Sequence, residues 1–478
     1  MLKKYFLSNI LITVLLNVLV KPVWIFVIDR NVQLTVGHEA YGLYGALLSL
    51  TIIFNILLDL GITNFNNKNI ASDQSQMMYA LPNMIMAKGI LSLLYLIVIF
   101  IMAYVFGYTG QALRLLIWLG VLQLLNSFLQ YLRSNISAHH DFKLDALLSV
   151  LDKIIMILIC SVLLFSNNYK SLFKIEWFVY SQIIAYLLAI TAAMVITIRR
   201  YTKIHFHLFS AKEIMKLGKQ SLPYALLILL MSIHMRSDTL ILERLKGATE
   251  NSYYSAAYRI LDAVNMLGVL FAGILLPMFS RMINNGTSLN NILKTSIHIL
   301  LPISLGIVAF SIAYKQNIMQ LLYHDGSQHL QQTYMYIIAS FPAYCLMYVF
   351  STLLTANGNI VLLIKIACVG CIVSIGLNFC LVPIYGSEAS AWVSCLVQWL
   401  LALLYMYQSI QKMNLQIQVK WIAQFALFFV LLLSTNIGMI YLSIPILMAV
   451  MSNMILFIIL VYGIKLWDKK TIMDFVKR

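Results

Sequence analysis

The chain has 478 residues, of which 61% are hydrophobic and only 10% are charged, and its mean hydropathy is +0.87. Soluble globular proteins carry about 25% charged residues, so this composition excludes a cytosolic enzyme, a secreted disulfide scaffold, a disordered chain and a fibre. The formal net charge is +16, but most lysines and arginines flank apolar segments, where they meet anionic lipid. A nucleic-acid partner is therefore not expected.

Long apolar segments recur along the whole chain, and about 20 apolar residues are enough to cross the hydrocarbon of a membrane. The first segment follows Lys3 and Lys4, is longer than the core of a signal peptide and precedes no small-residue cleavage site, so we expect it to be retained. Fourteen spans are predicted, near residues 6–28, 41–62, 83–105, 112–133, 144–166, 176–198, 221–243, 255–279, 292–313, 333–356, 361–384, 387–408, 420–441 and 444–465.

The apolar segments are solid blocks rather than the alternating ten-residue strands of a β-barrel. The sequence therefore predicts an all-α polytopic membrane protein of about 14 transmembrane helices, with two pseudo-twofold-related six-helix lobes and two further helices. The predicted parts are an N-terminal lobe (1–200, helices 1–6), a basic cytoplasmic linker (201–220), a C-terminal lobe (221–410, helices 7–12), and helices 13–14 with a cytoplasmic tail (411–478).

A short internal repeat supports the division into two lobes. The segment Gly37–Ala46 aligns with Gly247–Ala256 at a constant offset and shares its Gly, Tyr and Ala positions. Each copy precedes the second span of its half. Parallel repeats of this kind are typical of alternating-access transporters.

The distribution of lysine and arginine predicts the orientation in the membrane. With the N-terminus in the cytoplasm, the inside segments hold roughly three times as many basic residues as the outside segments. We therefore expect both termini to be cytoplasmic.

Ionisable side chains inside a bilayer are costly and normally pair with one another or face an aqueous cavity. Basic side chains outnumber acidic ones among those in or at the edges of the predicted spans, and arginine and lysine suit phosphate oxygens. The pattern favours an anionic substrate, although each group could also be a satisfied ion pair or a helix-end residue reaching the interface. The residues are Lys21, Arg30, Asp59, Lys88, Asp152, Lys153, Arg236, Asp238, Arg259, Asp262 and Lys365.

Other chemistry is not expected. Cys368 and Cys371 have the spacing of a redox motif but lie in an apolar run, where they read as packing residues. The histidines at 139–140 and 205–207 lack a tetrahedral ligand set, so no metal site is predicted. The chain has no phosphate-binding loop and no hydrolase motif, so we predict neither an enzyme nor ATP-driven transport.

Three groups of short motifs carry a family resemblance. They are Asp29–Tyr44 with Leu58–Gly61; Leu222–Pro223, Arg236–Asp238, Tyr254–Arg259 and Leu276–Pro277; and Asn357–Asn359, Asn378, Val382–Gly386 and Ala389–Ala391. In order and spacing they resemble the polysaccharide-exporter branch of the multidrug/oligosaccharidyl-lipid/polysaccharide flippase superfamily, typified by bacterial O-antigen flippases. Val36 and Ser390 depart from the residues that are usual there.

The resemblance implies a central cationic cavity in which Arg259 matches an arginine of lipid II-flipping relatives, and a sodium site in the C-terminal lobe. Ser374 and Asn378 are weaker ligands than the residues of those relatives. The predicted substrate-binding residues are Lys21, Arg30, Lys88, Arg236, Arg259 and Lys365, and the predicted coupling-ion residues are Asp238, Ser374, Asn378 and Ser394.

The resulting hypothesis is a flippase of the bacterial inner (plasma) membrane that moves isoprenoid-diphosphate-linked oligosaccharide from the cytoplasmic to the outer leaflet by alternating access, for cell-surface polysaccharide biosynthesis. No cofactor is expected, and Na⁺ or H⁺ is the possible coupling ion. The expected partners are the polyprenyl-diphosphate-linked glycan, membrane lipids, and a polymerase and glycosyltransferases of the same pathway. The alternatives are a cation-coupled drug or small-molecule exporter of the same superfamily and a non-transporting membrane scaffold.

Overall fold

The computed structural model describes residues 16, 17, 19–61, 63, 70, 77–139, 141–201, 211–416 and 418–467. Within these ranges the regular structure is helical and contains no strand. Residues 202–210 of the predicted linker, the histidines at 140, 205 and 207, and the two ends at 1–15 and 468–478 lie outside the described residues.

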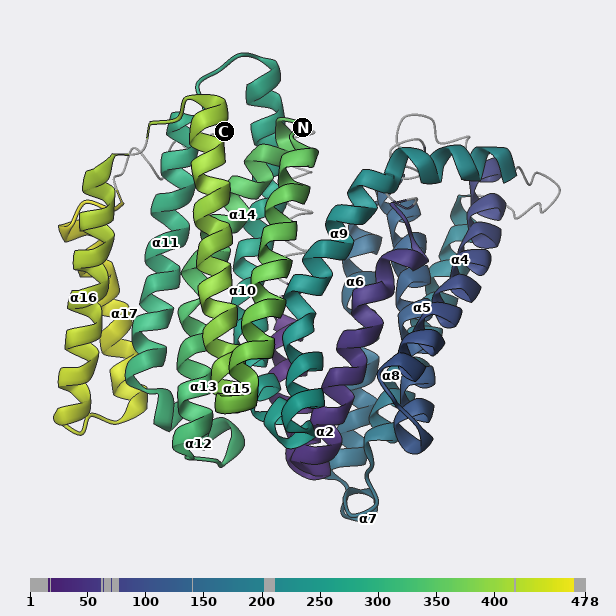
Figure 1. The fold of residues 1–478 in the computed structure, drawn as a ribbon, viewed down its shortest axis with the longest axis horizontal. Helices are drawn as coiled ribbons and strands as arrows, with labels where there is room; N and C mark the ends of the chain where they lie inside the picture. Colours follow the sequence, from purple (N-terminus) through teal and green to yellow (C-terminus); the bar gives the residue numbers. More distant parts are fainter. Residues whose placement is uncertain are drawn as a thin grey trace. The chain divides into compact units, whose positions relative to one another are not determined.

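Long helices make up nearly all of the described chain (Figure 1). In chain order they are η1 (Trp24–Asp29), α2 (Arg30–Ile53), η2 (Phe54–Leu58), α4 (Met77–Val105), α5 (Gly110–Ala138), α6 (Phe142–Phe165), α7 (Asn167–Lys170), α8 (Ile175–Arg200), α9 (Ala211–Lys246), α10 (Ala248–Asn284), α11 (Asn290–Ala313), α12 (Lys315–Tyr323), α13 (Gln328–Ala339), α14 (Phe341–Ala356), α15 (Ile360–Met413), α16 (Val419–Tyr441) and α17 (Ile446–Gly463).

The described residues contain 12 helical segments that are long and apolar enough to cross a membrane. Two of them, Leu19–Leu58 with 40 residues and Ile360–Met413 with 54, are about twice the length that one crossing requires. Each of these two folds back on itself, so together the 12 segments supply fourteen crossings. The predicted fold class, an all-α polytopic protein with about 14 transmembrane helices, is confirmed.

The first hairpin turns at Gly37, whose φ of +83° lies in the region that glycine adopts without strain. The Tyr41 hydroxyl donates to the Asp29 carboxylate at 2.7 Å although the two residues are 12 positions apart. In a continuous helix they would be separated by about 18 Å. Gly247, the partner of Gly37 in the sequence repeat, has a φ of +91° at the turn between α9 and α10, so both repeated glycines mark helix-to-helix turns.

The second hairpin turns at Gly386 within α15, where φ is +59°. The Ser390 hydroxyl donates to the side-chain oxygen of Asn378 at 3.0 Å across the turn. Further from the turn, Gly370 packs so closely on Leu401 that an added Cβ would lie 2.9 Å from that side chain. The two halves of α15 are therefore antiparallel and in contact along their length.

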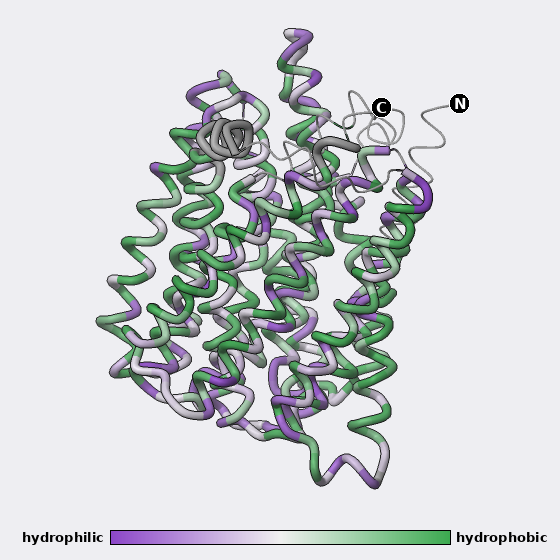
Figure 2. The backbone as a smooth tube through the Cα atoms, turned by 90° about the vertical axis from the view of Figure 1, so that its right-hand side faces the viewer, coloured by the Kyte–Doolittle hydropathy of each residue, from purple (hydrophilic) through white to green (hydrophobic). Residues whose placement is uncertain are grey.

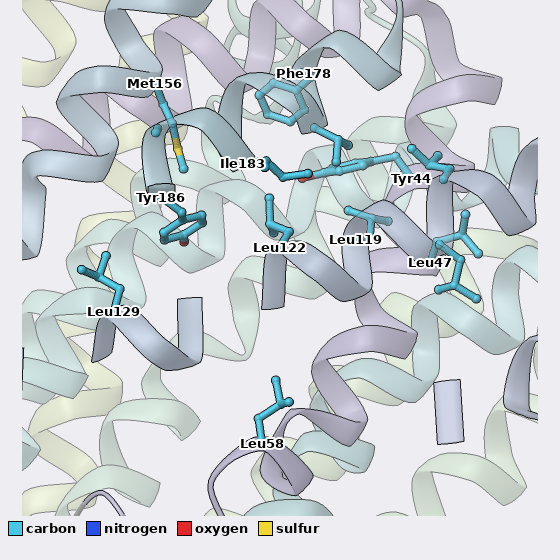
Figure 3. Packing of buried hydrophobic residues seen from close by; sticks show 14 of the residues in the cluster. Tyr44, Leu47, Leu58, Leu119, Leu122, Leu129, Met156, Phe178, Ile183 and Tyr186 are labelled. Atoms are coloured by element: carbon cyan, nitrogen blue, oxygen red, sulfur yellow. The ribbon is translucent and has the colours of Figure 1, made fainter. Parts of the chain in front are cut away.

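The chain divides into two compact units, residues 1–252 and residues 253–478. Unit 1 has its core among α2, α5, α6 and α8, where Tyr44 packs edge-on against Phe178 with ring centroids 5.5 Å apart (Figure 3). Leu119, Leu122 and Ile183 fill the space around these rings.

Within unit 1, the two repeat segments contact each other. A Cβ on Gly42 would lie 1.7 Å from the carbonyl oxygen of Ala248, so only glycine permits this approach. The Asn251 side chain donates to the Gly42 carbonyl at 2.7 Å, and Gln33 donates to the Ser252 hydroxyl at 3.0 Å. The glycine and the small polar residues of the repeat thus make a tight helix crossing.

Unit 2 is built on α11, α13, α14 and α15, with Phe341, Tyr344 and Phe350 fully enclosed. The final helices α16 and α17 pack on α11, where the Trp467 indole donates to the His298 carbonyl at 2.7 Å. Asn453 donates to the side-chain oxygen of Asn436 and joins α17 to α16.

The side chains that face outward are largely apolar. Hydrophobic residues follow the helices through their middle sections (Figure 2), and large aliphatic side chains such as Leu93 and Ile372 are exposed on α4 and α15. Exposed apolar surface on this scale is expected where lipid is the solvent.

Candidate functional site

Three cations gather in unit 1 from different helices, and we call Lys21, Arg133 and Lys153 the cationic cluster. The Lys153 ammonium lies 3.0 Å from the carboxylate of Asp152, its neighbour on α6. It also lies 5.5 Å from the centre of the Trp24 ring and 5.4 Å from that of Tyr186. Aromatic faces attract cations, so the two rings hold this ammonium in place within the bundle.

The other two members of the cluster come from the first helix and from α5. Arg133 Nε lies 2.9 Å from the carboxylate of Asp145, and about a quarter of the arginine side chain is exposed. Lys21 is half-buried and lies within electrostatic reach of both Arg133 and Lys153. With Asp145 and Asp152 included, the group carries three positive and two negative charges, so one positive charge is left uncompensated within it.

Lys88 lies elsewhere in unit 1 and is fully engaged. Its ammonium is 2.9 Å from Asp59, 3.0 Å from the Ser127 hydroxyl and 3.2 Å from the Leu58 carbonyl, and only 5% of the residue is exposed. The ring of Tyr131 lies 5.6 Å away. These contacts neutralise the charge and join α4 to η2 and α5.

Arg259 lies on α10 in unit 2, one turn before Asp262. The closest approach of the two charged groups is 4.0 Å, a loose pairing, and about a quarter of the arginine is exposed. Beside them, the hydroxyls of Tyr258 and Tyr344 are 3.4 Å apart, and Asn265 donates to the Tyr348 hydroxyl at 3.2 Å. A polar, tyrosine-rich wall between α10 and α14 therefore accompanies this arginine.

The remaining predicted cations are in three further helices. Arg30 begins α2 beside the buried Asp29, and Arg236 is half-buried in α9. Lys365 is exposed near the start of α15. The structure thus brings Lys21 together with Arg133 and Lys153, which were not among the predicted binding residues.

The predicted coupling-ion residues belong to both units. Asp238 is buried on α9 in unit 1, while Ser374, Asn378 and Ser394 are buried on α15 in unit 2. The Asn378 amide donates to the Ser374 carbonyl at 2.9 Å and accepts from Ser390. On α15, Ser374, Asn378 and Ser390 form a neutral hydrogen-bonded network.

Ser387, His329 and Glu388 form a polar relay in unit 2 that the sequence did not reveal. The His329 ring lies 2.8 Å from the Ser387 hydroxyl and 2.9 Å from the Glu388 carboxylate. This order of groups occurs in hydrolases, but Ser387 is completely buried and also contacts Thr333 at 3.2 Å. Its hydroxyl is therefore closed off from a substrate, and the relay ties α13 to the hairpin turn at Gly386.

The family model described as "Polysaccharide biosynthesis protein" matches residues 6–283, which is more than half of the chain. The chain belongs to this polysaccharide biosynthesis family. No curated protein matches its sequence.

Solved structures with the same fold include a flippase and several transporters. The lipid II flippase MurJ in an inward closed conformation superposes with a TM-score of 0.70 at 14% identity, covering 94% of this chain and 98% of the other. An inward-facing multidrug resistance MATE transporter of the MOP superfamily gives 0.64 at 15% identity, covering 82% and 94%. A MOP superfamily transporter from Pyrococcus furiosus gives 0.54 at 15% identity, covering 85% and 94%.

For this member of the polysaccharide biosynthesis family, sequence reasoning left two members of the cationic cluster out of the predicted binding set. Arg133 stands at the end of a predicted span, where it was counted among the cytoplasmic basic residues, and Lys153 follows an acid with which it could form an ion pair. The sequence carried no signal that joins the three, because Lys21 lies nearer the outer end of the span predicted at 6–28, whereas Arg133 and Lys153 lie towards the cytoplasmic ends of theirs. Ser390 was noted only as a departure from the motif, yet its hydroxyl closes the α15 hairpin.

Proposed function

We propose that this protein is a flippase for isoprenoid-diphosphate-linked oligosaccharide, carrying the headgroup from the cytoplasmic to the outer leaflet of a bacterial inner membrane. In this proposal both termini are cytoplasmic, as the excess of basic residues in the inside segments indicates. The family and the fold support transport of a membrane-embedded substrate. The nature of that substrate is argued from the charges below.

The observation that carries the proposal is the uncompensated positive charge of the cationic cluster. A diphosphate is expensive to move into hydrocarbon because its hydration is lost. Lysine and arginine replace that hydration with charge-assisted hydrogen bonds. Lys21, half-buried and beside two cations that already have carboxylate partners, is the natural ligand for an incoming phosphate.

Arg259 is the second element of the proposed binding machinery. Its pairing with Asp262, at 4.0 Å, is longer than the ion pairs of Lys88, Arg133 and Lys153, and a guanidinium can bind two phosphate oxygens at once. The neighbouring tyrosine wall offers hydroxyl groups to sugar rings. Because a ligand shifts a conformational equilibrium only through its different affinity for the two states, we propose that this arginine binds the headgroup in one state of an alternating-access cycle.

The test is headgroup translocation in vesicles reconstituted with the full chain and a polyprenyl-diphosphate-linked oligosaccharide. Arg259→Ala is expected to slow translocation at least tenfold, the loss of one hydrogen bond to a charged group. Arg259→Lys should restore part of the rate because it keeps the charge. Arg281→Ala is the matched control, since Arg281 is an exposed cation near the far end of the same helix. Wild-type translocation by the Arg259→Ala protein would overturn the assignment.

Coupling to Na⁺ or H⁺ is a second part of the proposal, with Ser374, Asn378 and Ser394 of α15 supplying neutral oxygens within unit 2. Asn378→Ala should abolish any acceleration of translocation by an inward sodium gradient. The rate in sodium-free potassium buffer should stay unchanged. Equal wild-type rates with and without sodium, at one fixed pH, would remove Na⁺ from the proposal and leave H⁺ to be tested with a pH gradient.

The charge balance also bears on the two alternative functions. A cation exporter needs available acids, but Asp59, Asp145 and Asp152 each pair with a lysine or arginine at 3.0 Å or less. If the protein is a non-transporting scaffold, a cysteine placed at position 259 should have an accessibility that substrate does not change, measured from either side of the membrane. A flippase predicts that substrate changes this accessibility.

A further inference from the structure

A groove of about 460 Å³ lies between the N-terminal ends of α5 and α8 in unit 1. Arg114, Lys174 and Glu176 supply its charged groups, and Trp118 and Tyr180 supply aromatic walls. It is distinct from the cationic cluster, because Arg133 lies more than five helical turns further along α5. Nothing in the proposed transport mechanism uses it.

The groove carries a net charge of +1. Arg114 and Lys174 are both exposed, and neither side chain makes an ion pair or a hydrogen bond within the part of the chain that the structure describes. Glu176 accepts a hydrogen bond from the Gln111 amide at 2.8 Å, which holds the carboxylate on its own side of the groove. Two cations and one acid leave one positive charge, which matches the single negative charge of a phosphodiester.

Both helices begin at the groove, which adds to its attraction for an anion. The first residues of α5 and α8, Gly110 and Ile175, have backbone N–H groups without side-chain caps. Helix N-termini carry a partial positive charge. This contribution supplements that of the two cationic side chains.

An exposed apolar track continues from the groove towards the middle of the membrane. The Trp118 and Tyr180 rings meet edge-on with centroids 5.3 Å apart, and each is about two-fifths exposed. On α8, Ile184 and Leu187 follow Tyr180 at helical spacing and are also exposed. A phosphate held at the groove would therefore place an acyl chain along this apolar track.

We propose that the groove binds one anionic phospholipid, with its phosphodiester between Arg114 and Lys174 and one acyl chain on the Trp118–Tyr180 track. The site does not depend on the proposed flippase activity. The lipid would belong to the outer leaflet, because α5 and α8 begin outside in the proposed orientation. This leaflet assignment alone rests on the proposed function. Tryptophan and tyrosine beside lysine and arginine are the usual anchors at a membrane interface.

The experiment is native mass spectrometry of the purified full chain titrated with phosphatidylglycerol or with zwitterionic phosphatidylcholine. The wild-type protein is expected to retain one phosphatidylglycerol in preference to phosphatidylcholine. Arg114→Gln/Lys174→Gln should weaken that binding about tenfold or more, since two interfacial cations are removed. Lys170→Gln/Lys246→Gln is the matched control, because it removes the same charge from exposed positions at the same end of unit 1.

Several outcomes would overturn the proposal. Equal retention of the two lipids by the wild-type protein would show that the groove does not recognise charge. An equal loss in both double variants would show that binding follows net charge rather than this groove. Saturation by inorganic phosphate alone would exclude a lipid ligand, and a preference for polyprenyl diphosphate over phosphatidylglycerol would assign the groove to transport substrate instead. Headgroup translocation, measured separately in the same variants, reports on the proposed function.

Discussion

Two parts of the molecule satisfy their buried polar groups in different ways. In unit 1, the contacts of Lys88 and Lys153 use full charges, since Lys88 pairs with Asp59 and Lys153 pairs with Asp152 at 3.0 Å or less. The hairpin of unit 2 uses neutral groups, as Asn378 and Ser390 join its two halves through one amide and one hydroxyl. Arg259 is the loosest of these charged contacts, at 4.0 Å from Asp262.

This difference shows that a charged residue within a span can be assigned to folding or to substrate binding only after its partner is known. Lys88 and Arg259 look alike in the sequence, since each interrupts an apolar segment. In the structure, Lys88 has three acceptors within 3.2 Å and serves packing, whereas the pairing of Arg259 with Asp262 is 4.0 Å long. Substitutions that separate stability from transport therefore test the comparison directly.

The largest expected loss of stability is from Lys88→Met. It leaves Asp59 without its cation in a partly enclosed place, and removal of one member of a buried pair costs about 3 kcal/mol of unfolding free energy. The measurement is a denaturant titration of the full chain in detergent micelles. Adding Asp59→Leu to this variant should recover more than half of the loss, because no charge is then left unpaired. A loss below about 0.5 kcal/mol in the single variant would contradict the structural role.

A smaller loss is expected from Ser390→Ala in unit 2. It removes one donor to the Asn378 side chain and costs about 1 kcal/mol, because both groups are neutral. The same titration measures it. Ser434→Ala is the control, since Ser434 is exposed on α16 and its hydroxyl bonds only within its own helix. If Ser390→Ala destabilised the protein more than Lys88→Met, the contrast between the two units would be wrong.

The smallest effect concerns the contact of Tyr201, which follows the last residue of α8 in unit 1 and lies outside the spans. Burial, together with a hydrogen bond to Asp141, raises the pKa of Tyr201 to about 12 from its ordinary value near 10. The folded state therefore holds this proton more tightly, so its stabilising contribution is complete below pH 10 and is lost between pH 10 and 12. The Tyr201→Phe variant should lose less stability than the wild-type protein between pH 10 and 12. The measurement is thermal unfolding of both proteins over that pH interval. Identical slopes would show that the contact is not formed in solution.

Much of the architecture was predictable from local patterns. Blocks of about 20 apolar residues predicted the spans, and the connections predicted at 29–40 and 385–386 contain Gly37 and Gly386, the turns where glycine has positive φ. The repeat at 37–46 and 247–256 was visible as a pattern, but its direct contact through Gly42 and Asn251 was not. Contact between segments far apart in sequence depends on packing, which local patterns do not contain.

The sequence by itself determined that the protein spans a membrane as an all-helical bundle and which family it resembles, because span length and apolar composition are properties of contiguous residues. Only the tertiary structure decided which charges are paired with other residues of the fold. Lys88 meets an acid 29 positions away, and Lys21 joins cations from two other helices. A buried charge takes its meaning from whatever the packing of the helices brings beside it, since the low dielectric of the bilayer interior makes that neighbour dominate its energy.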